Sequence, residues 1–483
     1  MVDNQLSTML LYFFGAVALC GAGILALGFF VDVNRHFNKW LLALVNPIVL
    51  AATAASSVLS NRDITNAEFE IGTASGEDSA ILVWLLRLVT MLVLGICAAR
   101  LIAASQSHER RPRQGRALFG AFLFFFVTNN VLNDIFGVKP VFDQRLLYPA
   151  LVFSVAYVGR NKGFTPIVDA TKWGLLLFCG ACLAAVALFP QAAVQQNYAG
   201  VLPSINFRLW GLGTNPNSTG PLALVLLLLQ IYRPFGNRAL QLLGYGIGLI
   251  VLALAQSKTA WAAALIAVPT LWWGNLLYTA QSRSLRRHSA YSLRSFSRPI
   301  LVCLLGLGAV AALAYITIQD PLAAMARDEQ VTSLTGRTDI WALAIDTWKQ
   351  NPLFGYGTSM WDVDFRRMSG MSFAYHAHNQ FLQSLSVAGV LGLLGLLLYT
   401  LVLFRHVFAA NTATRGFSLA LFWVIFIRYF TEAPLTMSSI FSGEFVTHLL
   451  LFSVVLTKGR EPAAETPAQP QQDYEPLQNL QWR

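Results

Sequence analysis

Long apolar windows recur along the chain, and they constrain its fold more than any other feature. Of the 483 residues, 55% are hydrophobic and only 12% are charged, which lies far outside the range of water-soluble domains. Each window is long enough for a helix to cross a hydrocarbon layer of about 30 Å. The windows are continuously apolar and do not alternate at every second residue, so they favour helices over a barrel. We therefore predict an all-α polytopic membrane protein.

The hydropathy pattern predicts about 12 or 13 transmembrane helices. The predicted spans are 9–31, 40–60, 80–103, 117–136, 145–158, 173–190, 216–232, 239–256, 259–280, 299–317, 379–403, 417–431 and 436–457. The window 145–158 is the weakest because it is short and contains Pro149. Without it, however, the alternation of the two membrane sides would be broken.

The net charge of +10 is explained by membrane topology, and we expect no nucleic-acid partner. Most Lys and Arg residues fall in alternate short loops and not on one face of a soluble domain. We expect these basic loops on the cytoplasmic side of the membrane. The basic loop residues are Arg35, Lys39, Arg110, Arg111, Arg113, Arg116, Arg160, Lys162, Lys172, Arg233, Arg238, Arg283, Arg286, Arg287, Arg294, Arg298, Arg405, Arg415, Lys458, Arg460 and Arg483.

The spans and loops divide the chain into five predicted parts. N-terminal helices occupy 1–190, central helices with short periplasmic loops occupy 191–317, and C-terminal helices occupy 379–457. Between them, 318–378 forms one large periplasmic loop. The end, 458–483, is rich in Pro, Gln and Glu, which is typical of a disordered tail.

The large loop contains an amphipathic stretch, 340–349, whose apolar residues repeat at helical spacing. We expect this helix to lie on the membrane surface. Asn351 and Pro352 should end it, and the segment Gly355-Tyr356-Gly357 should form a bend.

A motif with fixed spacing follows this stretch. His378-Asn379 is separated by nine residues from Gly389-Val390-Leu391-Gly392. This pattern resembles the signature of the O-antigen ligase and O-antigen/exopolysaccharide polymerase superfamily, in which His and then Asn, Ser or Gln precede nine residues and Gly-x-x-Gly.

Further blocks extend the resemblance over roughly 200–460. The first block is Arg208-Leu209-Trp210-Gly211, followed by Asn215-Pro216-Asn217. In Gln256-Ser257-Lys258, Lys258 stands where relatives commonly have Arg, which puts its role in doubt. The first 190 residues match only as generic spans.

The resemblance implies a fold like that of type C glycosyltransferases, with one large periplasmic loop, in the bacterial inner membrane. It also implies a metal-independent inverting transfer that requires no cofactor. The donor would be a glycan linked to undecaprenyl pyrophosphate, and the acceptor a hydroxyl of another glycan or of lipid A core, on the periplasmic side. Polysaccharide export proteins are further candidate partners.

Three cations are candidates to bind the donor pyrophosphate. The leaving group gains negative charge as the glycosidic bond breaks, so fixed cations stabilise the transition state. Arginine suits this role because its planar fork donates to two phosphate oxygens. We assign it to Arg337 and Arg208, with Lys258 as a third candidate; Arg208 on its own could equally be a headgroup anchor.

His378 is the candidate general base. A sugar hydroxyl is a poor nucleophile until its proton is removed, and neutral imidazole can accept that proton near pH 7. A role in positioning the substrate remains open for His378. Asn379 could orient neighbouring polar groups.

The remaining candidates have competing interpretations. His376 is a structural or substrate-contacting residue, and Trp361 could stack on a sugar or belong to the interfacial aromatic belt. Arg366 and Arg367 could contact the donor or only solvate the loop. A metal site built from the two histidines with Asp362 and Asp364 is an alternative, but the spacing is not diagnostic, so we predict no metal. We expect Arg428 to pair with Glu432.

The function that we favour is a polymerase of surface-polysaccharide repeat units, because the Gly-Tyr-Gly, Trp361 and His-Ala-His-Asn segments resemble exopolysaccharide polymerases. A ligase that attaches O-antigen to lipid A core shares the signature and remains close. A protein O-oligosaccharyltransferase is disfavoured, because such enzymes commonly carry an extended soluble C-terminal domain. A transporter of lipid-linked glycans is the alternative from another class.

Overall fold

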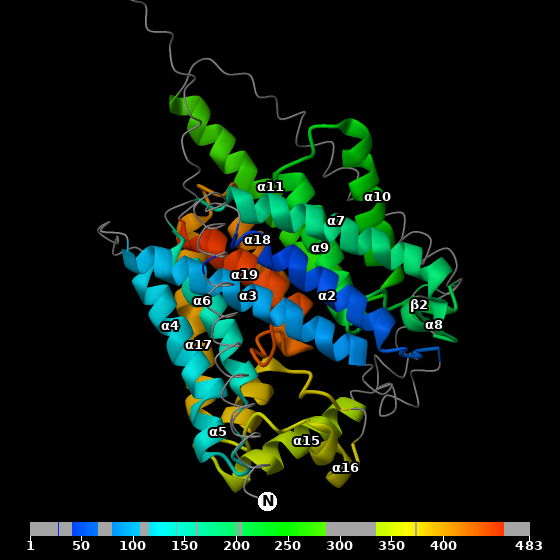
Figure 1. Cartoon of the computed structure of the whole chain (residues 1–483). Helices are drawn as coiled ribbons and strands as arrows, with labels where there is room; N and C mark the ends of the chain where they lie inside the picture. Colours follow the sequence, from blue (N-terminus) through cyan, green and yellow to red (C-terminus); the bar gives the residue numbers. More distant parts are fainter. Residues whose placement is uncertain are drawn as a thin grey trace, which may run out of the picture.

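The protein is a bundle of helices with α15 (Thr335–Gln350) and α16 (Val363–Met368) at one end (Figure 1). The computed structural model describes residues 28, 41–65, 80–106, 115–141, 143–160, 163–198, 200, 202, 205–285, 335–371 and 374–457. Its helices are α2 (Val45–Leu59), α3 (Ala80–Gln106), α4 (Arg116–Asn130), α5 (Leu132–Phe136), η1 (Gln144–Leu147), α6 (Tyr148–Val158), α7 (Thr165–Leu188), α8 (Pro190–Ala193), α9 (Pro216–Tyr232), α10 (Arg238–Leu254), α11 (Lys258–Leu285), α15 (Thr335–Gln350), α16 (Val363–Met368), α17 (Gln380–Ala410), α18 (Phe417–Phe426), η3 (Ile427–Phe430) and α19 (Gly443–Leu456).

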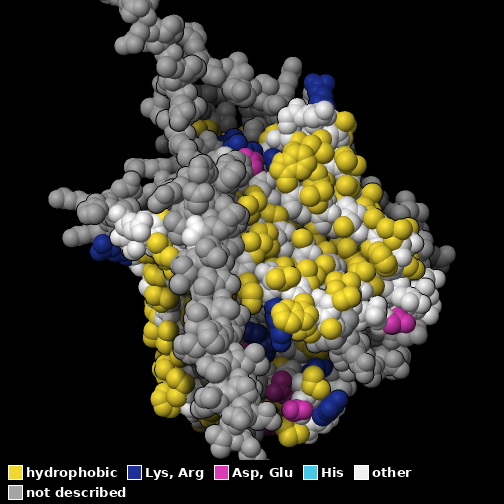
Figure 2. Space-filling model, in the orientation of Figure 1, with side chains coloured by type: hydrophobic (Ala, Val, Ile, Leu, Met, Phe, Trp, Pro, Cys, Tyr) yellow, Lys and Arg dark blue, Asp and Glu magenta, His cyan; other side chains and the backbone are white. Residues whose placement is uncertain are grey.

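The described part of the chain contains five helices that are long and apolar enough to cross a membrane: α3, α4 with α5, α7, α11 up to Tyr278, and α17. Shorter apolar helices include α2, α10, α18 with η3, and α19. Figure 2 shows apolar side chains over much of the described middle of one face, with charged ones gathered near α15 and α16. The prediction of an all-α polytopic membrane protein is confirmed.

Eleven of the predicted spans coincide with these helices or with α6 and α9. The predicted spans 9–31 and 299–317 lie outside the described residues, apart from 28. The last span begins later than predicted, at Gly443 and not at 436, because 436–442 forms a non-helical wall of the cavity described below. The division of the chain into five parts remains a prediction.

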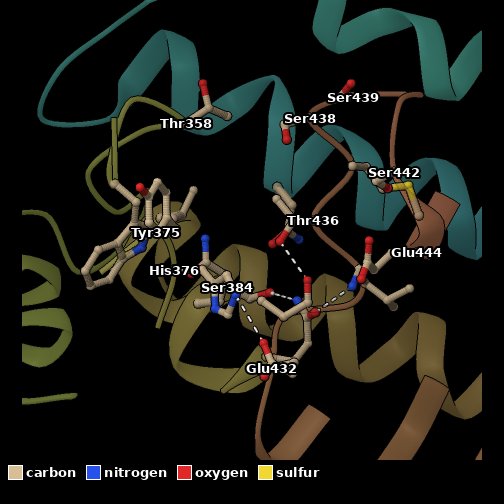
Figure 3. A pocket seen from close by; sticks show the side chains of 18 of the residues that line it. Thr358, Tyr375, His376, Ser384, Glu432, Thr436, Ser438, Ser439, Ser442 and Glu444 are labelled. Carbon is tan, nitrogen blue, oxygen red and sulfur yellow. Dashed lines mark hydrogen bonds and ion pairs between the residues drawn. The ribbon is translucent and has the colours of Figure 1, made fainter. Parts of the chain in front are cut away.

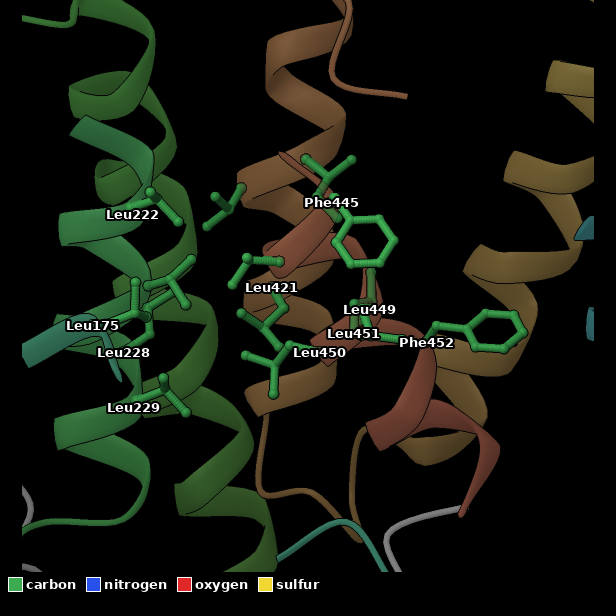
Figure 4. Close-up of a cluster of buried hydrophobic side chains, with 14 of the residues drawn as sticks. Leu175, Leu222, Leu228, Leu229, Leu421, Phe445, Leu449, Leu450, Leu451 and Phe452 are labelled. Carbon is green, nitrogen blue, oxygen red and sulfur yellow. The ribbon is translucent and has the colours of Figure 1, made fainter. Parts of the chain in front are cut away.

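Helix α9 lies at the centre of the bundle. All of its residues except Asn217 are buried, as expected for a helix that is apolar on every side. It packs against α7, α10, α11, α18 and α19. Figure 4 shows its leucines Leu222, Leu228 and Leu229 facing the same core as Leu421 and Leu450. This packing fixes the position of the α9 N-terminus, which reaches the candidate site.

One short antiparallel pair of strands lies in the 191–215 loop. Strand β1 (Val194–Gln196) pairs with β2 (Phe207–Leu209) so that Gln195 lies opposite Arg208. The indole nitrogen of Trp210 donates to Gln195 Oε1 over 2.9 Å. The hairpin therefore holds Arg208 in a defined register above the bundle.

The amphipathic stretch in the large loop is helical, as predicted, but it does not turn its apolar face to the membrane. In α15, Ile340 and Ala344 are buried in a separate small core with residues such as Tyr356, Phe365 and Ala377. The indole nitrogen of Trp341 donates to the Ala377 carbonyl over 2.9 Å. Since the apolar face is covered by the loop's own residues, the expectation of a surface-lying helix was wrong.

The two signature glycines create a kink and a close approach in α17. Gly389 has a non-helical backbone with φ +67°, and a Cβ there would overlap the Leu353 carbonyl. Gly392 accepts a hydrogen bond from Asn129 of α4 through its carbonyl, at 2.9 Å. The kink is tied to the 352–357 segment by hydrogen bonds from Gly357 N to Val387 O and from Val390 N to Pro352 O, both 2.9 Å. These bonds fix the bend that the sequence predicts at 355–357.

Candidate functional site

The candidate site lies where four segments meet at one end of the bundle. These segments are the β2 strand with the first turn of α9, the 374–379 loop before α17, the 431–442 loop before α19, and the start of α15. Polar side chains converge there around one carboxylate, that of Glu432 (Figure 3).

Glu432 is the hub of the site. It is only 3% exposed, and a buried carboxylate requires several partners. Its Oε1 accepts a hydrogen bond from Asn217 Nδ2 over 2.6 Å. Its Oε2 lies 3.2 Å from His376 Nε2 and 3.6 Å from His378 Nδ1. Burial raises the pKa of Glu432, but the histidine contacts outweigh burial and hold that pKa well below its usual value. Glu432 is therefore ionised.

The tautomer of His376 follows from its two contacts. The backbone N–H of His378 donates to His376 Nδ1 over 3.0 Å, so Nδ1 carries the lone pair. In the neutral ring the proton must then be on Nε2, which faces Glu432 and donates to it. His376 is thus a positioning group between the 378 backbone and the carboxylate.

His376, His378 and Glu432 could also be considered as metal ligands, since their donor atoms lie within 4.8 Å of one another. A metal-binding imidazole normally donates its second N–H to an acceptor. The second nitrogen of His376 instead accepts a hydrogen bond, which does not suit coordination through Nε2. The carboxylates considered from the sequence are elsewhere: Asp362 caps α16 by accepting from Phe365 N, and Asp364 is exposed.

His378 is placed beside this pair with an unusual backbone, φ +47°. Burial lowers the pKa of His378, followed by the electrostatic effects of His376 and of the Arg337 charge, whereas Glu432 opposes the shift. The ring is therefore neutral at pH 7. Because its Nδ1 faces Glu432, its Nε2 is left to accept a proton from another molecule. A carboxylate beside one ring nitrogen also orients catalytic histidines elsewhere, although the 3.6 Å from Nδ1 to Glu432 is longer than a hydrogen bond.

Arg208 is joined to the hub through Asn217. Its guanidinium donates to Asn217 Oδ1 over 2.9 Å and, through Nε, to the Ala255 carbonyl over 3.0 Å. Burial lowers the pKa of Arg208, while Tyr198 and Glu432 oppose the shift. Arginine keeps its proton even so, and a positive charge therefore lies close to Glu432.

Arg337 and Lys258 lie near the same centre. Arg337 is in the first part of α15, one turn before Trp341, which bonds to the 374–379 loop. Its charge acts on His378. Lys258 begins α11 next to Gln256, whose carbonyl is 3.5 Å from an Arg208 nitrogen. The structure thus places Arg208 and Arg337 near the Glu432–His378 group, and Lys258 follows Gln256 by two residues at the start of α11. The role of the three cations as donor-binding residues stays a prediction.

The other predicted site residues are placed differently from one another. Asn379 is the N-cap of α17, and its side-chain oxygen accepts from Phe381 N and Leu382 N. Trp361 lines the cavity and is buried. Arg366 is buried and stacks on Tyr375 at 4.0 Å, whereas Arg367 is exposed on α16.

Three residues of the site were not identified as such from the sequence. Glu432 was assigned as an ion-pair partner of Arg428, but Arg428 instead pairs with Glu444 at 2.7 Å. The i, i+4 rule fails because the chain leaves the helix at η3, so the two side chains diverge. Asn217 belonged to the block Asn215-Pro216-Asn217 but was given no role, and Tyr375 carried no signal beyond its position beside His376.

A polar cavity of about 400 Å³ opens next to the hub. Its walls come from α4, α17, α19 and the loops around 360, 375 and 436–442. His376 and Glu432 form part of its lining, and Figure 3 shows Tyr375, Ser384, Thr436 and Ser438 around the same space. A substrate in this cavity would touch the carboxylate–histidine group.

Comparison with known proteins agrees with this geometry. The O-antigen ligase family model matches residues 243–397, which cover α11, α15 and the signature in α17. No curated protein matches the chain. The matched family implies a glycosyl-transfer enzyme with a lipid-linked glycan donor in a lipid bilayer. The match over residues 243–397 therefore supports the resemblance of the chain to the O-antigen ligase and polymerase superfamily.

Proposed function

We propose that this protein is an inner-membrane polymerase that transfers a glycan from undecaprenyl pyrophosphate to the hydroxyl of the next lipid-linked repeat unit, on the periplasmic side. The observation that carries the proposal is the convergence of Arg208, His376 and His378 on Glu432 beside a polar cavity, with the charge of Arg337 acting on His378. Cations for a diphosphate and a base for a hydroxyl are the two components that this transfer requires.

The transfer itself would proceed by direct displacement. The acceptor oxygen attacks the anomeric carbon, the bond from that carbon to the phosphate oxygen breaks, and the electron pair leaves with the pyrophosphate. His378 Nε2 takes the hydroxyl proton. Arg208 and Arg337, with Lys258, stabilise the charge on the leaving phosphates. Attack from the face opposite the phosphate inverts the anomeric centre.

Glu432 has a positioning role in this scheme. It faces Nδ1 of His378 at 3.6 Å, which favours the tautomer with a free Nε2 lone pair. It also stabilises the imidazolium that forms when the proton is transferred. Asn217 and His376 hold the carboxylate in place from two other directions.

The periplasmic orientation is supported by the charges at the opposite end of the bundle. Among the described residues at that end, the acidic side chain is Asp169, while the basic ones are Arg116, Arg160, Lys172, Arg233, Arg238, Arg405 and Arg415. Cytoplasmic loops carry such an excess of Lys and Arg. The candidate site would then face the periplasm.

The alternatives are a ligase acting on lipid A core and a transporter of lipid-linked glycans. The ligase uses the same chemistry and differs only in its acceptor. A transporter would place functional charges near the membrane midplane, whereas Arg208, His378 and Glu432 lie in segments between or beyond the spans.

The decisive experiment is reconstitution. Purified protein in proteoliposomes would receive undecaprenyl-pyrophosphate-linked repeat units, either alone or with lipid A core, and products would be separated by mass. Lipid-linked oligomers in the mixture without lipid A core would support the polymerase. Glycan joined to core in the mixture with lipid A core would support the ligase. If neither product forms while labelled lipid-linked glycan crosses the bilayer, the enzyme proposal is wrong.

A further inference from the structure

The cavity beside Glu432 has a charge pattern that discriminates among sugars. Its lining includes the carboxylates of Asp362, Glu432 and Glu444, while Arg428 is the lining residue with a fixed positive charge among those described. Arg428 is already paired with Glu444 at 2.7 Å, and both lie in the wall. Lys139, next to the lining, is 3.7 Å from Asp362. Arg428 and Lys139 thus each form an ion pair with a carboxylate of the protein, and an anionic sugar would have to compete with that carboxylate for either cation.

The remaining polar lining consists of neutral hydroxyl and amide groups. Such groups can both donate to and accept from sugar hydroxyls. Besides His376 and the indole of Trp361, they include Asn129, Thr214, Gln383, Ser384, Ser438 and Ser439. A uronate or phosphate placed among them would face the carboxylates without a compensating cation, which is unfavourable.

Tyr375 adds a platform for a sugar ring. It lines the cavity and remains 46% exposed, although a large aromatic side chain is normally more buried. The guanidinium of Arg366 stacks on the ring at 4.0 Å from its centre. This contact holds the ring in place, so stacking by a sugar costs little conformational entropy.

We infer that this cavity binds an uncharged segment of glycan, stacked on Tyr375, and rejects segments that carry carboxylate or phosphate groups. The inference rests on the proposed function for its biological meaning and narrows the substrate class to neutral repeat units. The segment could come from the acceptor or from the donor glycan, because both carry the same sugars. The experiments below treat the two sources separately.

Binding is tested first, without lipid-linked donor. Full-length protein in nanodiscs would be titrated with neutral glucose and N-acetylglucosamine oligomers and with galacturonic acid oligomers of equal length, using saturation-transfer NMR. We expect the acidic oligomers to bind about tenfold more weakly at low ionic strength, with a smaller difference at high salt. Equal or tighter binding of the acidic oligomers overturns the inference.

Variants locate the binding to this cavity. Tyr375→Ala should weaken neutral oligomers about tenfold, while Tyr375→Phe keeps the ring and most of the affinity. Tyr278→Ala is the matched control, since Tyr278 is exposed on α11, away from the cavity. Glu444→Gln removes the partner of Arg428 and should raise the affinity for galacturonate relative to neutral oligomers. Unchanged neutral binding in a folded Tyr375→Ala protein also refutes the inference.

Transfer assays then identify the source. Acidic groups would be introduced into the acceptor in one arm and into the donor glycan in the other. The arm in which transfer falls about tenfold identifies which glycan occupies the cavity, and no fall in either arm overturns the inference. Because the binding assay needs no donor, a protein that binds neutral sugars but transfers nothing would disprove the proposed function alone.

Discussion

The side-chain amide of Asn217 donates to Glu432 over 2.6 Å, and this contact joins the buried central helix to the loop that follows η3. The same amide accepts from Arg208 over 2.9 Å. Arg208, proposed to bind the donor phosphates, and Glu432, proposed to orient His378, are thus connected through Asn217 by hydrogen bonds. A substitution of Arg208 should therefore also affect the position of Glu432.

Glu432→Gln should lower the transfer rate about 10- to 100-fold, because the carboxylate no longer stabilises the imidazolium of His378. It should also change the pH profile. The base must be unprotonated, so the wild-type rate should fall only below the ordinary imidazole pKa of 6.5, since the pKa of His378 is lowered. Glu432 raises that pKa, so its removal should move the acid limb further down. Transfer rates of wild type and Glu432→Gln would be measured across a pH series. If the acidic midpoint of the rate profile is the same in both proteins, Glu432 does not act on His378.

His378→Asn tests the base without straining the chain. The backbone at His378 has φ +47°, and asparagine tolerates this region better than alanine does. We expect a loss of about 10²- to 10⁴-fold in transfer, the usual contribution of a general base, with donor binding retained. Steady-state rates and donor affinity would be measured in parallel. Loss of donor binding alone would instead identify His378 as a positioning residue.

Arg208→Lys should reduce transfer at least about tenfold. A single ammonium cannot reproduce donation to both Asn217 and the Ala255 carbonyl while also contacting phosphate. Arg367→Lys is the matched control, because Arg367 is exposed on α16 outside the cavity lining; it should change the rate less than twofold. Equal effects of the two substitutions would rule out a special role for Arg208.

Chelation should leave transfer unchanged. The contacts of His376 place its proton on Nε2, toward Glu432, so that a metal ion would have to displace it. Transfer would be measured after dialysis against EDTA and after adding back Zn²⁺, Mn²⁺ or Mg²⁺, with the bound metal determined by mass spectrometry. Activity lost to EDTA and restored by one ion would show that the three residues form a metal centre.

Gly389→Ala should prevent stable folding or cost several kcal/mol, because a Cβ would overlap the Leu353 carbonyl and the φ is +67°. Gly370→Ala is the control: Gly370 has φ +70°, but its Cβ would meet nothing within 4 Å, so only about 1–2 kcal/mol of backbone strain is expected. Thermal unfolding in detergent compares them. Similar melting temperatures would mean that the close approach is not needed.

The sequence by itself determined that this protein lies in a membrane, and it located most of the helices. In lipid there is no water to hydrogen-bond the backbone, so a continuously apolar segment must satisfy its N–H and C=O groups internally, as a helix does. Eleven of the predicted spans are helices in the described structure. The spacing from His378 to Gly389 also predicted the family that the model match at 243–397 supports. Residues this close in sequence lie along one helix and its kink, so their spacing can be read without the tertiary structure.

Only the tertiary structure decided which polar groups meet. Glu432 is more than 50 residues away from His376 and more than 200 away from Asn217 in sequence, and no periodicity links such positions. Local rules paired it wrongly with Arg428, because they assume a continuous helix. The apolar face of α15 was likewise assigned to lipid, since a sequence shows that a face must be buried but not what covers it. Packing around α9 brings these distant residues together.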